Sequence, residues 1–207
     1  MGKIWKKLLK IGIAAVGLIA LLVLLGGCRT DRTTVAASGT SDGQDAYHTD
    51  PVPEGRPQPV EPDSAYVDAD RSQECTISIS CATILDHLDL CAENKRALVP
   101  SDGVILPATT VTFSQGESVY DILQRVCLDD GIHMESKVTP MYNSAYIQGI
   151  NNLYEFDVGA QSGWMYQVNG WFPNYGCSRY QVEDGDVICW VYTCNQGADV
   201  GDNSLNR

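Results

Sequence analysis

Histidines and paired acidic residues are the first candidates for chemistry in this 207-residue chain. The three histidines, His48, His87 and His133, stand far apart and lack the partner pattern of a nucleophile with its base. Asp184 and Asp186 flank a glycine, which is more typical of a hairpin turn than of a metal site. No HExxH, GxSxG, phosphate-loop or EF-hand pattern occurs. We therefore expect no catalytic residue, no metal site and no enzyme activity.

Cysteines are the next candidates. Seven of the eight follow residue 70: Cys75, Cys81, Cys91, Cys127, Cys177, Cys189 and Cys194. Seven cannot all pair within one chain, and the export signal described below favours an oxidising exterior. Cys75 and Cys81 would lie ~20 Å apart in an extended strand, so they cannot bridge each other. We expect two or three disulfides and one free thiol, and no zinc or redox site because no CxxC pair occurs.

Aromatic residues could bind a ligand without catalysis. The stretch 163–194 holds three of the four tryptophans. Trp164 and Trp190 fall at strand positions, where core packing is expected. The strand that contains Trp164 is followed by a segment interrupted by Pro and Gly, in which aromatic side chains are difficult to bury. Its candidate binding residues are Trp171, Phe172, Asn174 and Tyr175. They predict a surface for a flat apolar ligand or a partner protein, and local packing is the alternative.

The elements that position these residues follow from periodicity. Residues 75–81 alternate apolar and polar side chains, which predicts a strand with one buried face. A helix is expected after Ser118, a good N-cap with Asp121 three positions on. Its apolar positions follow the spacing i, i+3, i+4, i+7: Val119, Ile122, Leu123 and Val126. Gly131 supplies the helix stop.

Further strands are expected over residues 104–113, 132–138, 153–156, 164–168 and 187–194, with a short helix over 93–98. Asn169-Gly170 predicts a type I′ hairpin turn. Strands, one packed helix and strands again predict an α+β fold with one sheet face covered. Because the last strand is apolar enough to be central, we expect a β-grasp-like mixed sheet whose first and last strands pair in the middle.

The N-terminus has the pattern of an export signal. Four lysines precede an uncharged apolar run of 15 residues, which is shorter than the ~20 that a membrane span needs. The run ends at Cys28 in a sequence that resembles a bacterial lipobox, which implies cleavage before Cys28 and a lipid on its sulfur. An uncleaved signal anchor is the alternative. We expect a lipoprotein with signal peptide 1–27, anchored to the outer face of the bacterial cell membrane.

Residues 28–72 are rich in Ser, Thr, Asp and Pro and show no apolar period, which predicts a disordered tether. The folded domain is expected over 73–195 and a flexible tail over 196–207. Without residues 1–27, ten basic residues stand against 26 acidic ones, a formal charge of −16. Such a surface is repelled by nucleic acid, so no nucleic-acid partner is expected.

A resemblance to a known family lies in five segments: Val111–Ser118, Ser162–Gly170, Pro173–Gly176, Ser178–Tyr180 and Asp184–Tyr192. They resemble the transcobalamin-C-terminal-like domains of Gram-positive surface proteins, over about 75–196. The resemblance implies a β-grasp-like domain related to the smaller domain of vertebrate cobalamin carriers. In those carriers the corrin lies between this domain and a separate helical barrel. The resemblance therefore implies cobalamin or a corrinoid-like ligand, not covalently bound, and a helical-barrel partner protein.

Two function classes follow. The first is a non-enzymatic cell-surface binding module, for a corrinoid-like ligand held together with a partner domain. The second is a surface adhesion or protein-interaction module that shares only the fold, because one fold hosts many functions.

Overall fold

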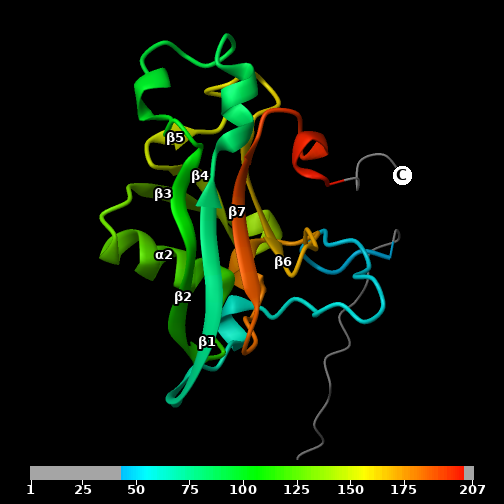
Figure 1. Ribbon diagram of the computed structural model, residues 1–207. Coiled ribbons are helices and arrows are strands. Elements are labelled where there is room, and N and C mark those ends of the chain that lie inside the picture. The colour runs from blue at the N-terminus through cyan, green and yellow to red at the C-terminus, as the bar shows by residue number, and fades with distance from the viewer. Residues whose placement is uncertain (1–42, 203–207) are drawn as a thin grey trace, which may run out of the picture. The chain divides into compact units, whose positions relative to one another are not determined.

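The computed structural model describes residues 43–202 (Figure 1), so the expected signal peptide and the lipidation site Cys28 lie outside the described part. The strands are β1 Asp68–Ser80, β2 Val104–Gln115, β3 Met134–Thr139, β4 Ser144–Ile150, β5 Leu153–Tyr154, β6 Gly163–Val168 and β7 Val187–Thr193. The main helix is α2, Val119–Asp129. Short 3-10 helices are η1 Pro62–Ser64, η2 Ala82–His87, η3 Arg96–Leu98, η4 Pro140–Tyr142, η5 Cys177–Arg179 and η6 Ala198–Val200. No helix over residues 43–202 is long and apolar enough to cross a membrane.

A four-stranded sheet has the order β2-β1-β7-β6, with β1 and β7 parallel and the other pairs antiparallel. The first and last strands thus pair in the middle, which confirms the expected β-grasp-like mixed sheet. Register places Ile79 beside Trp190, and Trp190 beside Tyr166, in one row across the buried face. The apolar composition of β7 suits this central position.

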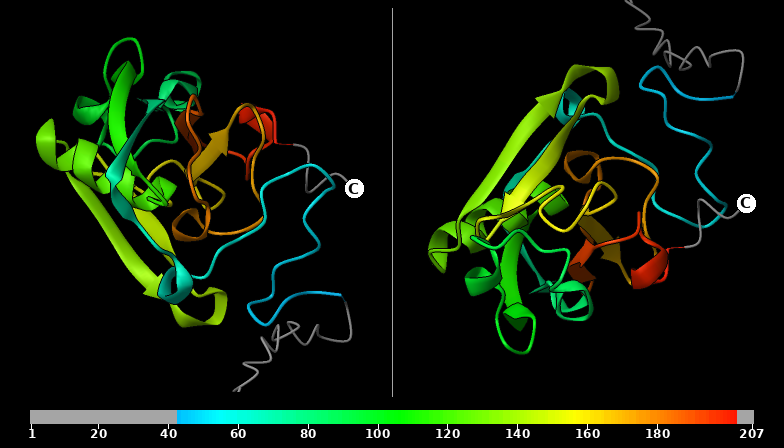
Figure 2. Two further views of the ribbon diagram at one scale, coloured as in Figure 1. Left: turned by 90° about the horizontal axis from the view of Figure 1, so that it is seen from below. Right: turned by 90° about the horizontal axis from the view of Figure 1, so that it is seen from above.

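A second layer covers one face of this sheet. Helix α2 and the three-stranded sheet β3-β4-β5 lie behind the four-stranded sheet in Figure 1, and Figure 2 shows them from both ends. The helix starts as expected, with a capping box. Ser118 Oγ accepts a hydrogen bond from the Asp121 N–H at 3.2 Å, and the Asp121 carboxylate accepts one from the Ser118 N–H at 2.8 Å. The apolar stripe of α2 is buried.

Three regions differ from the sequence expectations. Strand β4 forms where no single element was expected, and only 96–98 of the expected helix 93–98 is helical. Strand β1 begins at Asp68, inside the expected tether, because 68–80 pairs along β2. The start of the expected tail is also fixed, since Asp199 accepts hydrogen bonds from the Thr193 hydroxyl, at 2.5 Å, and from the Cys194 N–H.

Residues 45–62 were also expected to be free chain, and this expectation is wrong. The Val60 N–H donates to the Arg179 carbonyl at 2.9 Å, and side chains at both ends of the segment bond to the domain. An apolar period was missing because polar and ionic contacts hold most of this segment, and Val52 is its residue that packs against the core. We call residues 45–62 the strap.

Candidate functional site

The predicted hairpin turn at Asn169-Gly170 positions the candidate binding residues. Asn169 and Gly170 both have positive φ, of 52° and 75°, and Val168 exchanges two backbone hydrogen bonds with Trp171. The Asn169 side chain joins this turn to the next one, because its amide donates to Asp186 at 2.7 Å. These observations confirm the type I′ hairpin prediction. They also show that the Asp186 side chain accepts a hydrogen bond that connects two turns.

The four candidate binding residues separate into two groups. Trp171 and Phe172 are half-buried, and Asn174 is exposed, as expected for a loop beyond a turn. Tyr175 is only 7% exposed, so the expectation that it would be open is wrong. Its ring stacks on Tyr180 with ring centroids 6.1 Å apart.

The strap covers most of this loop. The Tyr175 hydroxyl donates to the Pro57 carbonyl at 2.7 Å, and the Asn174 amide donates to the Asp50 carbonyl at 2.9 Å. The Arg56 guanidinium lies 5.2 Å from the centre of the Trp171 ring, a cation–π contact. Three of the four candidate residues therefore face the chain's own strap.

Arg179 is the centre of this contact and was missed by the sequence analysis. Its side chain is 1% exposed, and one nitrogen lies 2.6 Å from both Asp45 and Glu61. A second nitrogen donates to the Thr49 hydroxyl at 2.6 Å. A buried cation requires such partners. The signal for it was that Arg179 is the single basic residue of 163–194, together with an acidic segment more than 100 residues upstream.

The pKa of the Asp45 carboxyl is shifted by its surroundings in the folded domain. Burial would raise the pKa of its carboxyl, but the hydrogen bonds from Arg179 and from the backbone N–H groups of Thr49 and Tyr47 outweigh burial. The pKa of Asp45 therefore lies below its ordinary value of 3.8. The carboxylate is thus fully charged at neutral pH.

Phe172 belongs to a different surface, an apolar pocket of about 200 Å³. Its walls come from β4, β6, β7 and the loop after the hairpin turn: Ala145, Ile147, Trp164, Tyr166, Phe172, Pro173 and Trp190 among them. Strand β4, which was not expected from the sequence, supplies one wall. We call this the β4–β6 pocket.

One residue that lines the β4–β6 pocket has a buried polar atom without a partner. Trp190 is 2% exposed, and its indole Nε1 has no hydrogen-bond acceptor among the described residues. The indole of Trp164, on the same wall, is satisfied because its Nε1 donates to the Leu153 carbonyl at 2.8 Å. Buried N–H groups normally have acceptors, so Trp190 marks a position where a ligand atom could accept a bond.

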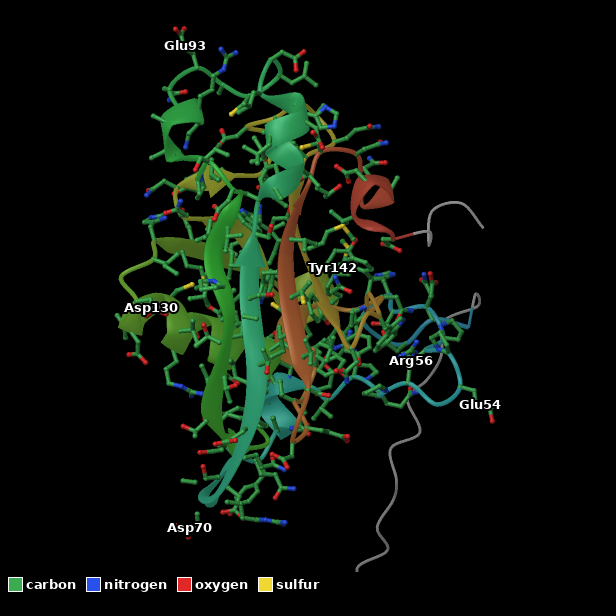
Figure 3. All side chains as sticks on the ribbon, in the orientation of Figure 1. Glu54, Arg56, Asp70, Glu93, Asp130 and Tyr142 are labelled. Atoms are coloured by element: carbon green, nitrogen blue, oxygen red, sulfur yellow. The ribbon has the colours of Figure 1, made fainter. Side chains whose placement is uncertain are left out.

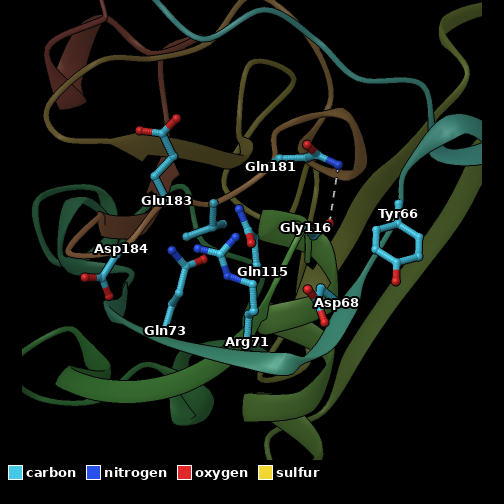
Figure 4. Close-up of a pocket in the computed structure, with 10 residues that line it drawn as sticks. Tyr66, Asp68, Arg71, Gln73, Gln115, Gly116, Gln181, Glu183 and Asp184 are labelled. Atoms are coloured by element: carbon cyan, nitrogen blue, oxygen red, sulfur yellow. Dashed lines mark hydrogen bonds between the residues drawn. The ribbon is translucent and has the colours of Figure 1, made fainter.

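A second hollow, of about 680 Å³, lies at the start of β1 and is polar. Figure 4 shows Arg71 and Gln73 rising from β1 into it, with Gln181 donating to the Gly116 carbonyl at 3.5 Å on its far side. The Gln73 side-chain oxygen is buried without a donor. Most of its lining residues are polar, with Tyr66 and Val182 among the others, and none of the predicted binding residues lines it.

The cysteines do not form the expected bridges. All seven that the structure describes, from Cys75 to Cys194, are free thiols. Cys75 in β1 and Cys81 directly after it are both buried in the core. Burial raises the pKa of Cys81 and Cys177 to about 12, so these thiols are protonated and poor nucleophiles at neutral pH.

The remaining polar candidates have structural contacts. Asp184 accepts from the Glu74 N–H at 2.9 Å, which joins the turn before β7 to β1. His48 packs against Tyr142 and His133 against Tyr154, so they stand in different surroundings. No group of three or more His, Cys, Asp or Glu within 43–202 could hold a metal ion.

Comparisons with known proteins match part of this architecture. A family model described as "Domain of unknown function (DUF4430)" matches residues 116–194, from the start of α2 to the end of β7. No curated protein matches the chain. The crystal structure of haptocorrin in complex with Cbi is 13% identical, with a TM-score of 0.45, and the comparison covers 62% of this chain and 26% of haptocorrin.

A second solved structure is a protein from Ruminococcus gnavus ATCC 29149, described provisionally as metal binding. It is 14% identical, with a TM-score of 0.35, and the comparison covers 58% of this chain and 96% of that one. Both TM-scores lie below 0.5, so neither likeness assigns a function. This chain spans about a quarter of the length of haptocorrin.

The strap should detach in acid. Because the folded-state pKa of Asp45 is lowered, its ion pair stabilises the attached strap above pH 3.8 and is lost as the pH falls through the lower folded value. NMR of the Val60 amide, from about pH 5 to about pH 2, should show it leaving its bonded state. Asp45→Asn should remove this acid transition. A Val60 signal that changes only together with the core amide of Ile79 would contradict the prediction.

The thiols should react in the order of their exposure. Alkylation of the native protein should label the half-exposed Cys189 and Cys194 first, whereas the denatured protein should take up seven labels on 43–202. Mass spectrometry without reductant measures both states. Fewer than seven labels after denaturation would show that bridges form in the protein as isolated.

Proposed function

We propose that this protein is an exported, lipid-anchored, non-enzymatic binding module at the outer face of the bacterial cell membrane. Its binding site is the β4–β6 pocket. One observation carries the site: Trp190, which lines this apolar pocket, has a buried indole N–H without an acceptor among the described residues. The export and anchoring part rests on the basic and apolar N-terminal pattern that ends at Cys28.

The unpartnered indole argues for a ligand on energetic grounds. A buried donor without an acceptor costs about 1–3 kcal/mol. A ligand that places a carbonyl or similar oxygen against Trp190 recovers this cost on binding. The surrounding rings of Trp164, Tyr166 and Phe172 supply apolar contact. The group that enters the pocket therefore combines an apolar body with one hydrogen-bond acceptor.

Pocket size limits how much of a ligand can enter. The volume of about 200 Å³ is below the ~300–1,000 Å³ of sites that enclose a whole small molecule. One group of a larger ligand fits, and the rest must lie outside, where a partner can cover it. A corrinoid has this form, because amide-bearing side groups surround its flat ring. The sequence resemblance to transcobalamin-C-terminal-like domains points to the same ligand class and to a helical-barrel partner.

The alternative is an adhesion or protein-interaction module that shares only the fold. The observation in its favour is the strap, since this domain already holds a peptide segment on the loop 171–175. The two functions use different surfaces of this loop. They can therefore be tested separately.

Corrinoid binding can be tested at Trp190. Titration of the protein with cobinamide and with cobalamin should give a saturable change in visible absorbance. Trp190→Phe should weaken it at least about tenfold, as expected for loss of one buried hydrogen bond of about 1.4 kcal/mol or more. Trp171→Phe is the matched control, because this indole lies outside the pocket lining, and it should bind like the wild type.

A stability measurement separates the pocket from ordinary core packing. Trp164→Phe should lower the free energy of unfolding by about 1–3 kcal/mol, because the Leu153 carbonyl loses its donor. Trp190→Phe should lower it less, since its N–H has no partner to lose. Equal losses in urea denaturation would show that Trp190 has an acceptor, and unchanged corrinoid spectra would exclude that ligand class.

Anchoring can be tested at Cys28. Cys28→Ala should release the protein into the medium or leave it with an unprocessed signal, because the lipid-bearing sulfur is gone. Intact mass and membrane fractionation measure both outcomes. A Cys28→Ala protein with the mass and membrane fraction of the wild type would contradict the lipoprotein proposal.

A further inference from the structure

We propose that the surface made by Trp171, Asn174, Tyr175 and Arg179 binds acidic, proline-containing peptide segments. We call this surface the strap site. The strap, residues 45–62 of the same chain, occupies it in cis. An equivalent segment of another chain can take its place.

The ionic part of the strap site has a defined ligand chemistry. Among the described residues, the side chain of Arg179 hydrogen-bonds to Asp45, Thr49 and Glu61, and all three belong to the strap. The Tyr47 ring, 5.3 Å from the guanidinium carbon, also belongs to it. A buried guanidinium whose partners all come from one segment is a preformed carboxylate site. Its remaining nitrogen, Nε, is buried without a partner.

The uncharged part of the strap site has the chemistry of proline-rich recognition. The strap carries Pro51, Pro53, Pro57, Pro59 and Pro62. Tyr175 and Asn174 donate to main-chain carbonyls of this segment, at Pro57 and Asp50. Aromatic side chains and donors aimed at exposed carbonyls are how proteins bind proline-rich extended segments, whose backbone makes no hydrogen bonds of its own.

The strap contributes little to the core, which makes it replaceable. Within 45–62, Thr49 is buried, and the prolines are half-buried or exposed. Figure 3 shows Glu54 at the outer tip of the strap, whereas the Arg56 guanidinium lies over the Trp171 ring. Its attachment therefore depends mainly on polar groups: two carboxylates, the Thr49 hydroxyl, a few carbonyl groups and the Arg56 cation–π contact, with Val52 packed against the core. A separate peptide with the same groups at the same spacing supplies the same contacts.

The experiment weakens the strap in the full chain and offers a replacement. The probe is a fluorescent peptide with the sequence of residues 43–64. Asp45→Asn with Glu61→Gln removes both counter-charges of Arg179, and this release variant should bind the probe at least about tenfold more tightly than the wild type does. Glu54→Gln with Asp63→Asn is the matched control. It removes two charges from exposed residues of the same region and should bind like the wild type.

Two further measurements show whether Arg179 is the receptor. Adding Arg179→Met to the release variant should abolish probe binding, and a probe with Asn at 45 and Gln at 61 should not bind the release variant. A release variant that keeps its near-ultraviolet circular dichroism but gains no affinity for the probe would overturn the proposal. So would binding that survives Arg179→Met.

A second variant keeps the test decisive if the release variant unfolds. Tyr175→Phe removes the hydroxyl that donates to Pro57 and leaves every charge in place. It should speed hydrogen exchange of the Val60 amide at least several-fold without changing that of the core amide of Ile79. If Val60 and Ile79 exchange together in the wild type and in Tyr175→Phe, the strap is an integral part of the domain, and the proposal fails. Corrinoid spectra do not enter this test, so its failure is distinguishable from failure of the β4–β6 pocket.

Discussion

The buried guanidinium of Arg179 is the constraint that fixes the N-terminal part of this domain, because its counter-charges come from the strap. A cation removed from water must be paired, and removing one partner of such a pair costs about 3–5 kcal/mol. Its counter-charges, Asp45 and Glu61, lie 134 and 118 residues upstream in the chain. The position of one side chain in the 3-10 helix η5 therefore fixes the course of the strap. The folded unit accordingly begins well before its first strand.

A second constraint comes from the large rings on the buried face of the four-stranded sheet. Trp190 lies between Ile79 and Tyr166 in the register, and the Tyr166 ring is 5.5 Å away. The neighbouring Trp164 turns its N–H to Leu153, whereas Trp190 finds no acceptor. The β4–β6 pocket lies beside these rings and is also lined by Ala145 and Ile147 of β4.

Periodic elements could be predicted from sequence, and long-range polar contacts could not. Strand 75–81, the helix after Ser118, the hairpin turn and the central last strand all carry a local apolar or turn pattern, and all are confirmed. The strap carries no such pattern because it is held by ion pairs and carbonyl bonds. The burial of Tyr175 was missed for the same reason, because its hydroxyl contacts the Pro57 carbonyl, which lies far away in the chain.

The candidate site was half predictable for a related reason. Composition singled out the loop 171–175 as a candidate, but it could not say which residue faces which surface. In a regular strand, side chains alternate between two sides. Here the neighbours Phe172 and Pro173 both line the pocket, and the neighbours Asn174 and Tyr175 both contact the strap. That pairing requires an irregular backbone, which the Asn-Gly turn and Pro173 provide. One short loop can then serve two binding surfaces because it is not a strand.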